Sequence, residues 1–248
     1  MDINNKLKIS CYCCTYGRPK ILEEAIYSFL IQNYNYKELI ILNDCKEQNL
    51  IFEHPQVKIF NCKERIIPLG KKFNTAVELC SGDIIMPWED DDIYLPWRIE
   101  VTLKHLNDGI FHTNNAFFEK SYQELEISKN LFHCNLAIEK NKFINVNGYP
   151  QKNYGAIDHD LFKKLIEKNG HFSKEIPLED IFYIYRWETT GSYHGSGIAP
   201  YKETNIEKIT ESLVKKNNFE KGDIKLNPKW KYDYVKKSQE LLKSIKYN

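Results

Sequence analysis

The chain has 248 residues, of which 42% are hydrophobic and 28% charged, and its formal net charge is +1. A chain of this length and composition can bury a full core, so we expect one enzyme-sized α/β domain. The near-neutral charge gives no overall field for nucleic acid, and no run approaches 18 apolar residues. We therefore expect neither a nucleic-acid partner nor a transmembrane segment.

The seven cysteines are an odd number scattered through the chain, which does not resemble a disulfide framework. The N-terminal residues also contain no apolar signal region, so we expect a soluble protein in the reducing cytoplasm. Side-chain alternation along a strand places Cys14 on the opposite face from Cys11 and Cys13. This pattern indicates buried thiols rather than a metal site.

The first elements form a strand, a helix and a second strand. Residues 8–14 are strand-like, and a turn then leads into a helix with Pro19 near its first position. Apolar residues recur in that helix at the spacing of one face, which can cover a sheet. The apolar run at residues 39–42 is typical of a strand buried on both faces, and it ends at Asn43 and Asp44.

A third strand is expected at residues 57–60, followed by a helix that begins near Lys71 and Lys72. Strands that alternate with helices predict a mostly parallel, Rossmann-like sheet with helices on both faces and ligands beyond the carboxyl ends of its strands. The glycine-rich dinucleotide turn and the phosphate-binding P-loop pattern are both missing from the sequence.

Four consecutive acids, Glu89 to Asp92, follow the apolar run at residues 84–88. Adjacent carboxylates repel one another, and Mg²⁺ or Mn²⁺ removes that repulsion while sharing its oxygen ligands with a substrate phosphate. We therefore predict a cation and diphosphate site. The alternative is a solvated acidic loop that precedes a helix starting near Pro96.

The middle of the chain contains a second acidic site. Strands are expected at residues 110–118 and 132–137, and a helix at residues 156–169 begins with Asp158 and Asp160. Asp158 is either a helix cap or a lone catalytic carboxylate.

A further strand at residues 181–187 leads into a loop rich in glycine and serine that carries His194. That histidine is a candidate contact for a metal or phosphate; the alternative is an ordinary surface histidine.

Residues 201–248 are rich in lysine, with helical patterns around 206–214 and 234–245. We predict a helical extension packed on a domain formed by residues 1–200. Its lysines most simply form a solvated face, and the alternatives are docking to a membrane surface or to a second copy of the chain. No sequence pattern specifies the oligomeric state.

Four short motifs occur in a fixed order along the chain. They are Cys-Thr-Tyr-Gly-Arg-Pro after the first strand, Leu-Asn-Asp after the second, Trp-Glu-Asp-Asp-Asp-Ile-Tyr-Leu-Pro in the middle, and Ile-Asp-His-Asp-Leu later. Together they resemble family 2 glycosyltransferases of the GT-A fold, over about residues 8–197.

The resemblance implies a nucleotide pocket at the first two strand ends. Thr15 and Tyr16 correspond to the turn that holds the base, and Arg18 in the same turn is included among the donor-binding residues. Asp44 corresponds to the acid that accepts the N–H of the base. Lys71 or Lys72 stands where the family often has a basic residue near the base or diphosphate.

The same resemblance implies a divalent cation, Mn²⁺ or Mg²⁺. By its spacing to the following proline, Asp91 matches the metal-binding acid and Asp90 the neighbour that contacts ribose or sugar. Glu89 stands where many members have Asp, so Asp92 remains an alternative ligand. His194 resembles a late histidine that completes the metal or diphosphate site.

The Glu-Asp motif of the family, whose Asp is the general base, falls on Ile157 and Asp158. The Glu is missing, which leaves Asp158 or Asp160 as the base. The implied reaction is an inverting, metal-dependent transfer from a nucleotide-diphosphate sugar to a hydroxyl of a glycan acceptor. UDP is the expected nucleotide, with GDP and dTDP open. The alternatives are a nucleotidyltransferase and a non-catalytic nucleotide-sugar or glycan-binding protein.

Overall fold

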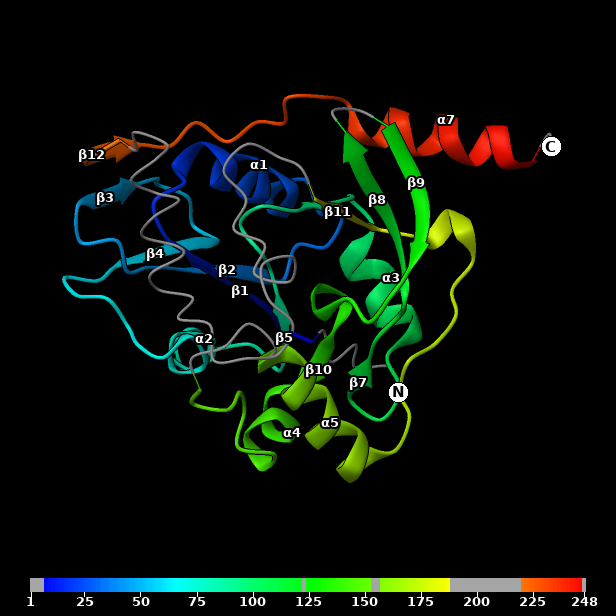
Figure 1. The fold of residues 1–248 in the computed structure, drawn as a ribbon, viewed down its shortest axis with the longest axis horizontal. Coiled ribbons are helices and arrows are strands. Elements are labelled where there is room, and N and C mark those ends of the chain that lie inside the picture. Colours follow the sequence, from blue (N-terminus) through cyan, green and yellow to red (C-terminus); the bar gives the residue numbers. More distant parts are fainter. Residues whose placement is uncertain (1–6, 122–123, 153–156, 188–219, 247–248) are drawn as a thin grey trace, which may run out of the picture.

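A six-stranded sheet in the order β4-β2-β1-β5-β10-β7 forms the centre of the molecule (Figure 1). The computed structural model describes residues 7–121, 124–152, 157–187 and 220–246. β1, β2, β4 and β5 run parallel, and β10 runs antiparallel to both β5 and β7. The strands of this sheet are β1 (Ile9–Thr15), β2 (Lys37–Asn43), β4 (Val57–Asn61), β5 (Ile84–Pro87), β7 (Ile110–Phe111) and β10 (Ala137–Glu139). The mixed α/β fold with a mostly parallel sheet is confirmed.

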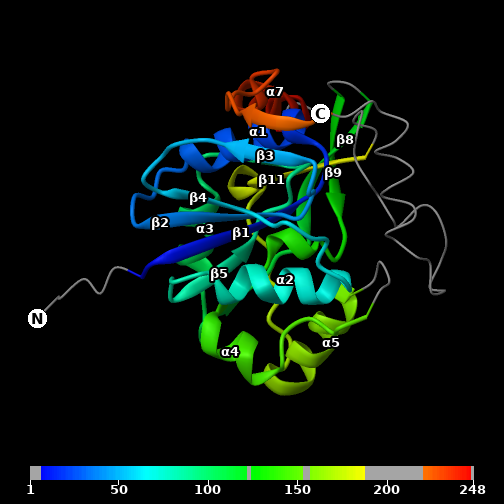
Figure 2. The same ribbon diagram turned by 90° about the vertical axis from the view of Figure 1, so that its left-hand side faces the viewer.

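Helices cover both faces of this sheet (Figure 2). One hydrophobic cluster joins the sheet to α1 (Pro19–Leu30) and α3 (Arg98–His105). The other joins it to α2 (Leu69–Glu78), α4 (Lys140–Asn145) and α5 (Ile157–Asn169).

The cysteines of β1 show how the sheet divides the core. Cys11 and Cys13 belong to the first hydrophobic cluster, whereas Cys14 belongs to the second. Strand alternation therefore places them as predicted. All seven cysteines have free thiols, and six of them are buried.

A second sheet, in the order β6-β11-β8-β9, lies beside the central one (Figure 1). It contains β6 (Ile93–Tyr94), β8 (Asn115–Ser121), β9 (Glu124–Lys129) and β11 (Tyr183–Arg186). The single strand expected at residues 110–118 was wrong, because β7 and β8 belong to different sheets. Asn135 fixes the break by donating from Nδ2 to the carbonyls of Thr113 and Asn115, at 2.8 and 3.0 Å.

Two other boundaries also differ from expectation. Residues 132–137 are not one strand, because the short 3-10 helix η1 (His133–Asn135) precedes β10. The helix expected from Pro96 begins at Arg98. Instead, the carbonyl of Pro96 accepts a hydrogen bond from the backbone N–H of Asn33 at 3.0 Å.

The C-terminal segment packs along α1, and one of its strands was not predicted. β12 (Gly222–Lys225) pairs in parallel with β3 (Gln48–Ile51). Neither strand was predicted, because each is only four residues long and contains polar residues. The helix expected at residues 234–245 is confirmed as α7 (Tyr234–Lys246). Trp230 Nε1 donates to Ser28 Oγ at 2.9 Å, which fastens the segment to α1. The expected helix at 206–214 and the domain boundary after residue 200 lie outside the described residues.

Across the part of the chain that the structure describes, we find no helix with the length and apolar character needed to cross a membrane.

A buried histidine makes the stability of the fold depend on pH. The ring of His112 has no solvent exposure, and its nitrogens lie 2.8 Å from Ser173 Oγ and 3.0 Å from the carbonyl oxygen of Phe132. Burial lowers its pKa from 6.5 to about 4. Since the unfolded chain binds this proton below pH 6.5 and the folded chain only near pH 4, the folded state loses stability as pH falls through this window.

We expect the free energy of unfolding to fall by about 2 kcal/mol between pH 7 and pH 5 through this group. Urea unfolding of wild type and His112→Asn measures the effect, and the variant should show the flatter pH dependence. His105→Asn, which removes a partly exposed histidine, is the control. Equal slopes in wild type and His112→Asn would show that His112 is not the group responsible.

Candidate active site

The carboxyl ends of β1 and β2 are joined by a buried lysine. Lys72 Nζ donates to the carbonyl oxygen of Thr15 at 2.8 Å and to Asp44 Oδ1 at 2.6 Å. Asp44 and Lys72 are 1% and 3% exposed, so their charges are screened little by solvent. Lys71, on the same helix, is exposed, so Lys72 is the lysine that meets the predicted base-binding acid.

Arg65, which sequence analysis did not identify, completes this group. Its Nη1 donates to Asp44 Oδ1 at 2.6 Å, and its guanidinium lies 3.8 Å from the centre of the Tyr16 ring. The backbone N–H of Ile66 donates to Asp44 Oδ2 at 3.0 Å. Thr15, Tyr16 and Asp44 are thus brought together as predicted. A basic residue shortly after the third parallel strand was the available signal for Arg65.

The acidic loop after β5 is organised by Arg18. Its Nε donates to Asp90 Oδ2 at 2.8 Å, its Nη2 donates to Asp90 Oδ1, and its Nη1 donates to Asp91 Oδ2 at 2.9 Å. Asp90 has no solvent exposure, and burial raises the pKa of its carboxyl while the charge of Arg18 opposes that shift. A paired guanidinium therefore fixes the acid predicted to contact ribose or sugar.

Asp92 points toward the second sheet. Its Oδ2 accepts from the Tyr183 hydroxyl at 2.6 Å, and its Oδ1 accepts from the backbone N–H of Arg186 at 3.0 Å. Arg186 Nε also donates to the carbonyl oxygen of Asp91 at 2.5 Å. Burial, and then the charge of Asp91, raises the pKa of Asp92 well above its usual range. These contacts tie the acidic loop to β11 and favour Asp91 over Asp92 as the residue that faces a cation.

Glu89 faces a group of side chains that sequence analysis missed. Its Oε1 lies 3.3 Å from His133 Nδ1, and His133 Nε2 is hydrogen bonded to the Tyr149 hydroxyl. That hydroxyl lies 2.6 Å from the hydroxyl of Tyr12 in β1. No periodic signal identified His133, because residues 132–137 were assigned to a strand.

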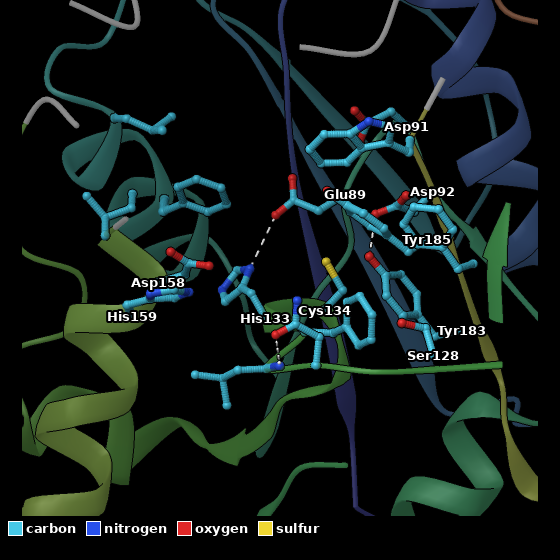
Figure 3. Close-up of a pocket in the computed structure, with 18 of the residues that line it drawn as sticks. Glu89, Asp91, Asp92, Ser128, His133, Cys134, Asp158, His159, Tyr183 and Tyr185 are labelled. Atoms are coloured by element: carbon cyan, nitrogen blue, oxygen red, sulfur yellow. Dashed lines mark hydrogen bonds and ion pairs between the residues drawn. The ribbon is translucent and has the colours of Figure 1, made fainter. Parts of the chain in front are cut away.

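The acidic loop forms one wall of a cavity of about 640 Å³ (Figure 3). Asp158, in the first turn of α5, lies across the cavity from Asp91, with Glu89 and His133 between them. Asp158 is among the lining residues. Asp160 is not, and its Oδ2 lies 3.7 Å from Lys152 Nζ. Of the two predicted bases, Asp158 is the one that faces this space.

Aromatic side chains from the second sheet and the loop before η1 form another wall of the cavity. The ring centres of Phe132 and Tyr185 are 5.5 Å apart, and those of Phe118 and Tyr185 are 5.7 Å apart. The ring centres of Trp187 and Tyr185 are 6.0 Å apart. A broad apolar surface that shares the cavity with several carboxylates suits a ring that carries hydroxyl groups.

The acidic loop has side chains that fit a divalent cation. Among the described residues, carboxylate oxygens of Glu89, Asp90 and Asp91 lie within 4.8 Å of one another. Oxygen ligands from carboxylates are those that Mg²⁺ and Mn²⁺ prefer. Because Arg18 already binds both oxygens of Asp90, Glu89 and Asp91 are the better placed ligands. His194 lies outside the described residues.

The chain is similar to bacterial and archaeal proteins named as glycosyltransferases. It is 28% identical over 179 residues to the GalNAc(5)-diNAcBac-PP-undecaprenol beta-1,3-glucosyltransferase of Campylobacter jejuni, a match that covers 68% of this chain and 55% of that protein. The chain thus spans about half the length of that relative.

Solved structures share the fold at low sequence identity. TarS of S. aureus, in complex with UDP-GlcNAc, has a TM-score of 0.60 and 11% identity over 96% of this chain and 72% of that chain. The mannosyltransferase PcManGT from Pyrobaculum calidifontis, in complex with GDP-Man and Mn²⁺, has a TM-score of 0.55 and 16% identity over 73% of this chain and 57% of that chain. The GT-A type of fold is confirmed.

A family model matches residues 10–160, which are more than half of the chain and include the carboxyl ends of β1, β2, β4 and β5. The chain belongs to glycosyl transferase family 2.

Proposed function

We propose that the protein is an inverting glycosyltransferase that uses a divalent cation to move a sugar from a nucleotide diphosphate to a hydroxyl of a saccharide acceptor. The observation that carries this proposal is the position of Asp158 across one cavity from Glu89 and Asp91. A single in-line displacement needs a leaving-group site and a base on opposite sides of the reacting carbon. The seven free thiols support a reducing, cytoplasmic setting.

The nucleotide is proposed to bind at the ends of β1 and β2. Tyr16 offers a ring face for a base, and Asp44 offers a buried carboxylate held by Lys72 and Arg65. A carboxylate can accept the imide N–H of uracil or thymine or the N1–H of guanine, and the resemblance to the family makes a uridine donor the first choice. TarS has been solved with UDP-GlcNAc and PcManGT with GDP-Man, so both nucleotides are tested below.

Glu89 and Asp91 are the residues proposed to hold Mn²⁺ or Mg²⁺. A bound cation supplies positive charge that stabilises the diphosphate leaving group. Arg18 keeps Asp90 and Asp91 in place through the hydrogen bonds described above. On the other side, Asp158 accepts the proton of the acceptor hydroxyl as the new glycosidic bond forms. No covalent intermediate is required.

The acceptor is proposed to lie against the aromatic wall of Phe118, Phe132 and Tyr185. An aromatic face packs against the apolar face of a pyranose ring, while carboxylates that line the same cavity accept hydrogen bonds from hydroxyl groups. The chemical class of the acceptor is therefore a saccharide.

Thermal unfolding with UDP, GDP and dTDP, each with and without Mn²⁺, tests the donor site. A ligand at 100 times its dissociation constant stabilises the folded state by about 2.7 kcal/mol. We expect UDP with Mn²⁺ to raise the Tm by roughly 5 °C and UDP alone to raise it less. A larger shift with GDP or dTDP would identify that nucleotide as the donor in place of UDP. No shift with any of the three would contradict the proposed donor site.

A further inference from the structure

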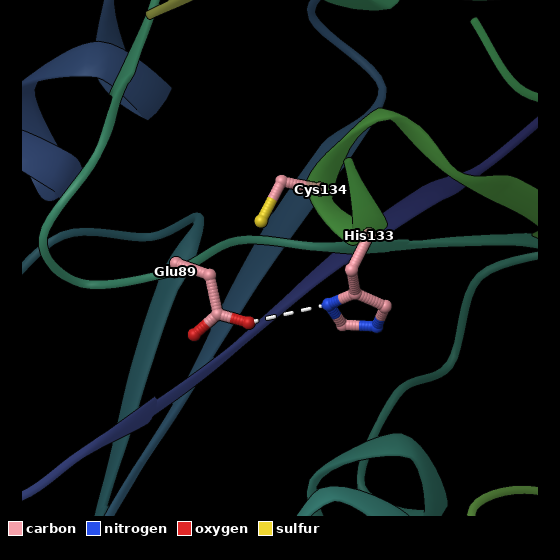
Figure 4. A group of neighbouring side chains, drawn as sticks. All are labelled: Glu89, His133 and Cys134. Carbon is pink, nitrogen blue, oxygen red and sulfur yellow. Dashed lines mark ion pairs between the residues drawn. The ribbon is translucent and has the colours of Figure 1, made fainter. Parts of the chain in front are cut away.

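Glu89 belongs to two groups of metal-ligating side chains. Besides its place in the acidic loop, its carboxylate lies within 4.8 Å of His133 nitrogen and Cys134 sulfur. Figure 4 shows the thiol and the imidazole directed toward the Glu89 carboxylate. Proteins bind Zn²⁺ through imidazole nitrogen, thiolate sulfur and carboxylate oxygen, whereas Mg²⁺ takes oxygen ligands and is rarely bound by nitrogen or sulfur.

The spacing of two of these atoms fits a tetrahedral ion. Zinc binds histidine nitrogen and carboxylate oxygen at about 2.0 to 2.2 Å, so two such ligands are separated by roughly 3.4 Å. The distance from His133 Nδ1 to Glu89 Oε1 is 3.3 Å. Little movement of the imidazole and carboxylate is needed to place an ion between them.

A hydrogen bond on the far side of the imidazole suits metal binding. His133 Nε2 is bonded to the Tyr149 hydroxyl, which is itself 2.6 Å from the Tyr12 hydroxyl. When Nε2 carries the proton and donates it to Tyr149, the lone pair of Nδ1 faces Glu89 and Cys134. Metal-binding histidines in proteins are commonly oriented by such a partner on their other nitrogen.

The segments that carry the three ligands are fixed to each other by a buried arginine. Arg98 Nη2 donates to the carbonyl oxygens of Pro87 and Cys134, at 2.8 and 2.5 Å. The backbone N–H of Glu89 donates to the Tyr94 hydroxyl at 2.7 Å. The three ligands therefore come from two segments, the loop after β5 and η1, that hydrogen bonds hold together. This arrangement lowers the entropic cost of bringing the ligands around an ion.

An ion can also reach this group. Glu89, His133 and Cys134 all line the cavity, and the Glu89 side chain is 23% exposed. A fourth coordination position would be filled by water from the cavity, as in zinc sites that remain open on one side.

We propose that Glu89, His133 and Cys134 form a second metal site, distinct from the Glu89 and Asp91 pair, that binds Zn²⁺ and inhibits sugar transfer when occupied. On binding, a zinc–sulfur bond forms, the zinc ion releases water, and the thiol proton passes to solvent. Inhibition follows because Zn²⁺ on Glu89 takes up a carboxylate proposed to bind the catalytic cation and places a second positive charge beside that cation. Zinc binding stands on the geometry alone, whereas inhibition rests on the proposed function.

Cobalt binding tests the site without measuring activity. Co²⁺ replaces Zn²⁺ in such ligand sets, and a cobalt–thiolate bond gives a charge-transfer absorption band. Titration of the full chain with Co²⁺ should produce that band, and added Zn²⁺ should remove it. The band should be absent in Cys134→Ser and present in Cys62→Ser, which removes a partly buried thiol elsewhere. His133→Asn should weaken Co²⁺ binding at least about tenfold.

No band in the wild type, or an equal band in Cys134→Ser, would overturn the site. Circular dichroism spectra that match the wild type show that each variant is folded. Zn²⁺ should then inhibit transfer by wild type at concentrations at least about tenfold lower than for Cys134→Ser, each relative to its own uninhibited rate. Equal inhibition would overturn the regulatory part. If the wild-type protein binds cobalt but transfers no sugar, the metal site is supported and the proposed function is contradicted.

Discussion

Asp158→Asn should lower kcat by about 10² to 10⁴-fold while the KM for the donor changes by less than about twofold. The asparagine side chain keeps the shape of the carboxylate but cannot accept the proton of the acceptor hydroxyl. Asp158 lines the cavity opposite the acidic loop, away from the β1 and β2 ends where the nucleotide is proposed to bind. The effect should therefore fall on the chemical step, and steady-state kinetics over a range of donor concentrations measures both kcat and the KM for the donor.

Asp160→Asn is the matched control for this prediction. Asp160 belongs to the same turn of α5, but it is not among the residues that line the cavity and it pairs with Lys152. We expect its kcat to remain within about threefold of wild type, because solvent-exposed ion pairs have small effects. A larger loss in Asp160→Asn than in Asp158→Asn would assign the base to Asp160 instead.

Asp91→Asn should lower kcat/KM by about 10³-fold and shift the Mn²⁺ requirement to higher concentration. The substitution replaces a charged cation ligand with a neutral amide, and it also removes the charge that Arg18 Nη1 contacts at 2.9 Å. Initial rates across a Mn²⁺ titration measure both effects.

Asp83→Asn provides the control for the acidic loop. Asp83 precedes the other end of β5, where its Oδ2 accepts from the backbone N–H of Lys8 at 2.7 Å. It should leave the Mn²⁺ dependence unchanged. An Asp91→Asn protein with wild-type affinity for Mn²⁺ and donor would show that Asp91 is not a cation ligand.

The sequence could predict the elements whose signal lies within a short window. Helix α1 is predicted by the spacing of its apolar residues and by Pro19, and the buried strand β2 is predicted by its unbroken apolar run. Such local patterns also placed Asp44 and the acids after β5 at strand ends. Because parallel strands end at one edge of a sheet, the shared crevice could be inferred as well.

The residues that sequence analysis missed depend on contacts between distant segments. Arg65 reaches Asp44 from a loop 21 positions further along the chain. His133 meets Glu89 only because Arg98 ties η1 to the end of β5. β3 and β12 pair although 174 positions separate them in the sequence, and neither is apolar enough to be recognised alone. A short window of sequence shows that Arg65 is basic and follows a strand, but it does not show which residue Arg65 contacts.

The four adjacent acids illustrate both the reach and the limit of sequence analysis. Their charge indicated a cation site, but not which carboxylates face it. The structure directs Asp90 to Arg18 and Asp92 to Tyr183 and Arg186. Side-chain direction in a tight turn depends on these partners, which lie more than 70 positions away. Glu89 and Asp91 remain as the proposed pair.

The anomeric configuration of the reaction product tests the proposed inverting transfer most directly. The wild-type protein is incubated with Mn²⁺, the nucleotide sugar whose nucleotide gives the largest thermal shift, and a panel of saccharide acceptors. NMR of the product should show a new glycosidic bond whose anomeric configuration is opposite to that of the donor, with one nucleoside diphosphate released per bond. Retained configuration, or no transfer from a donor that binds, would contradict the proposed inverting glycosyltransferase.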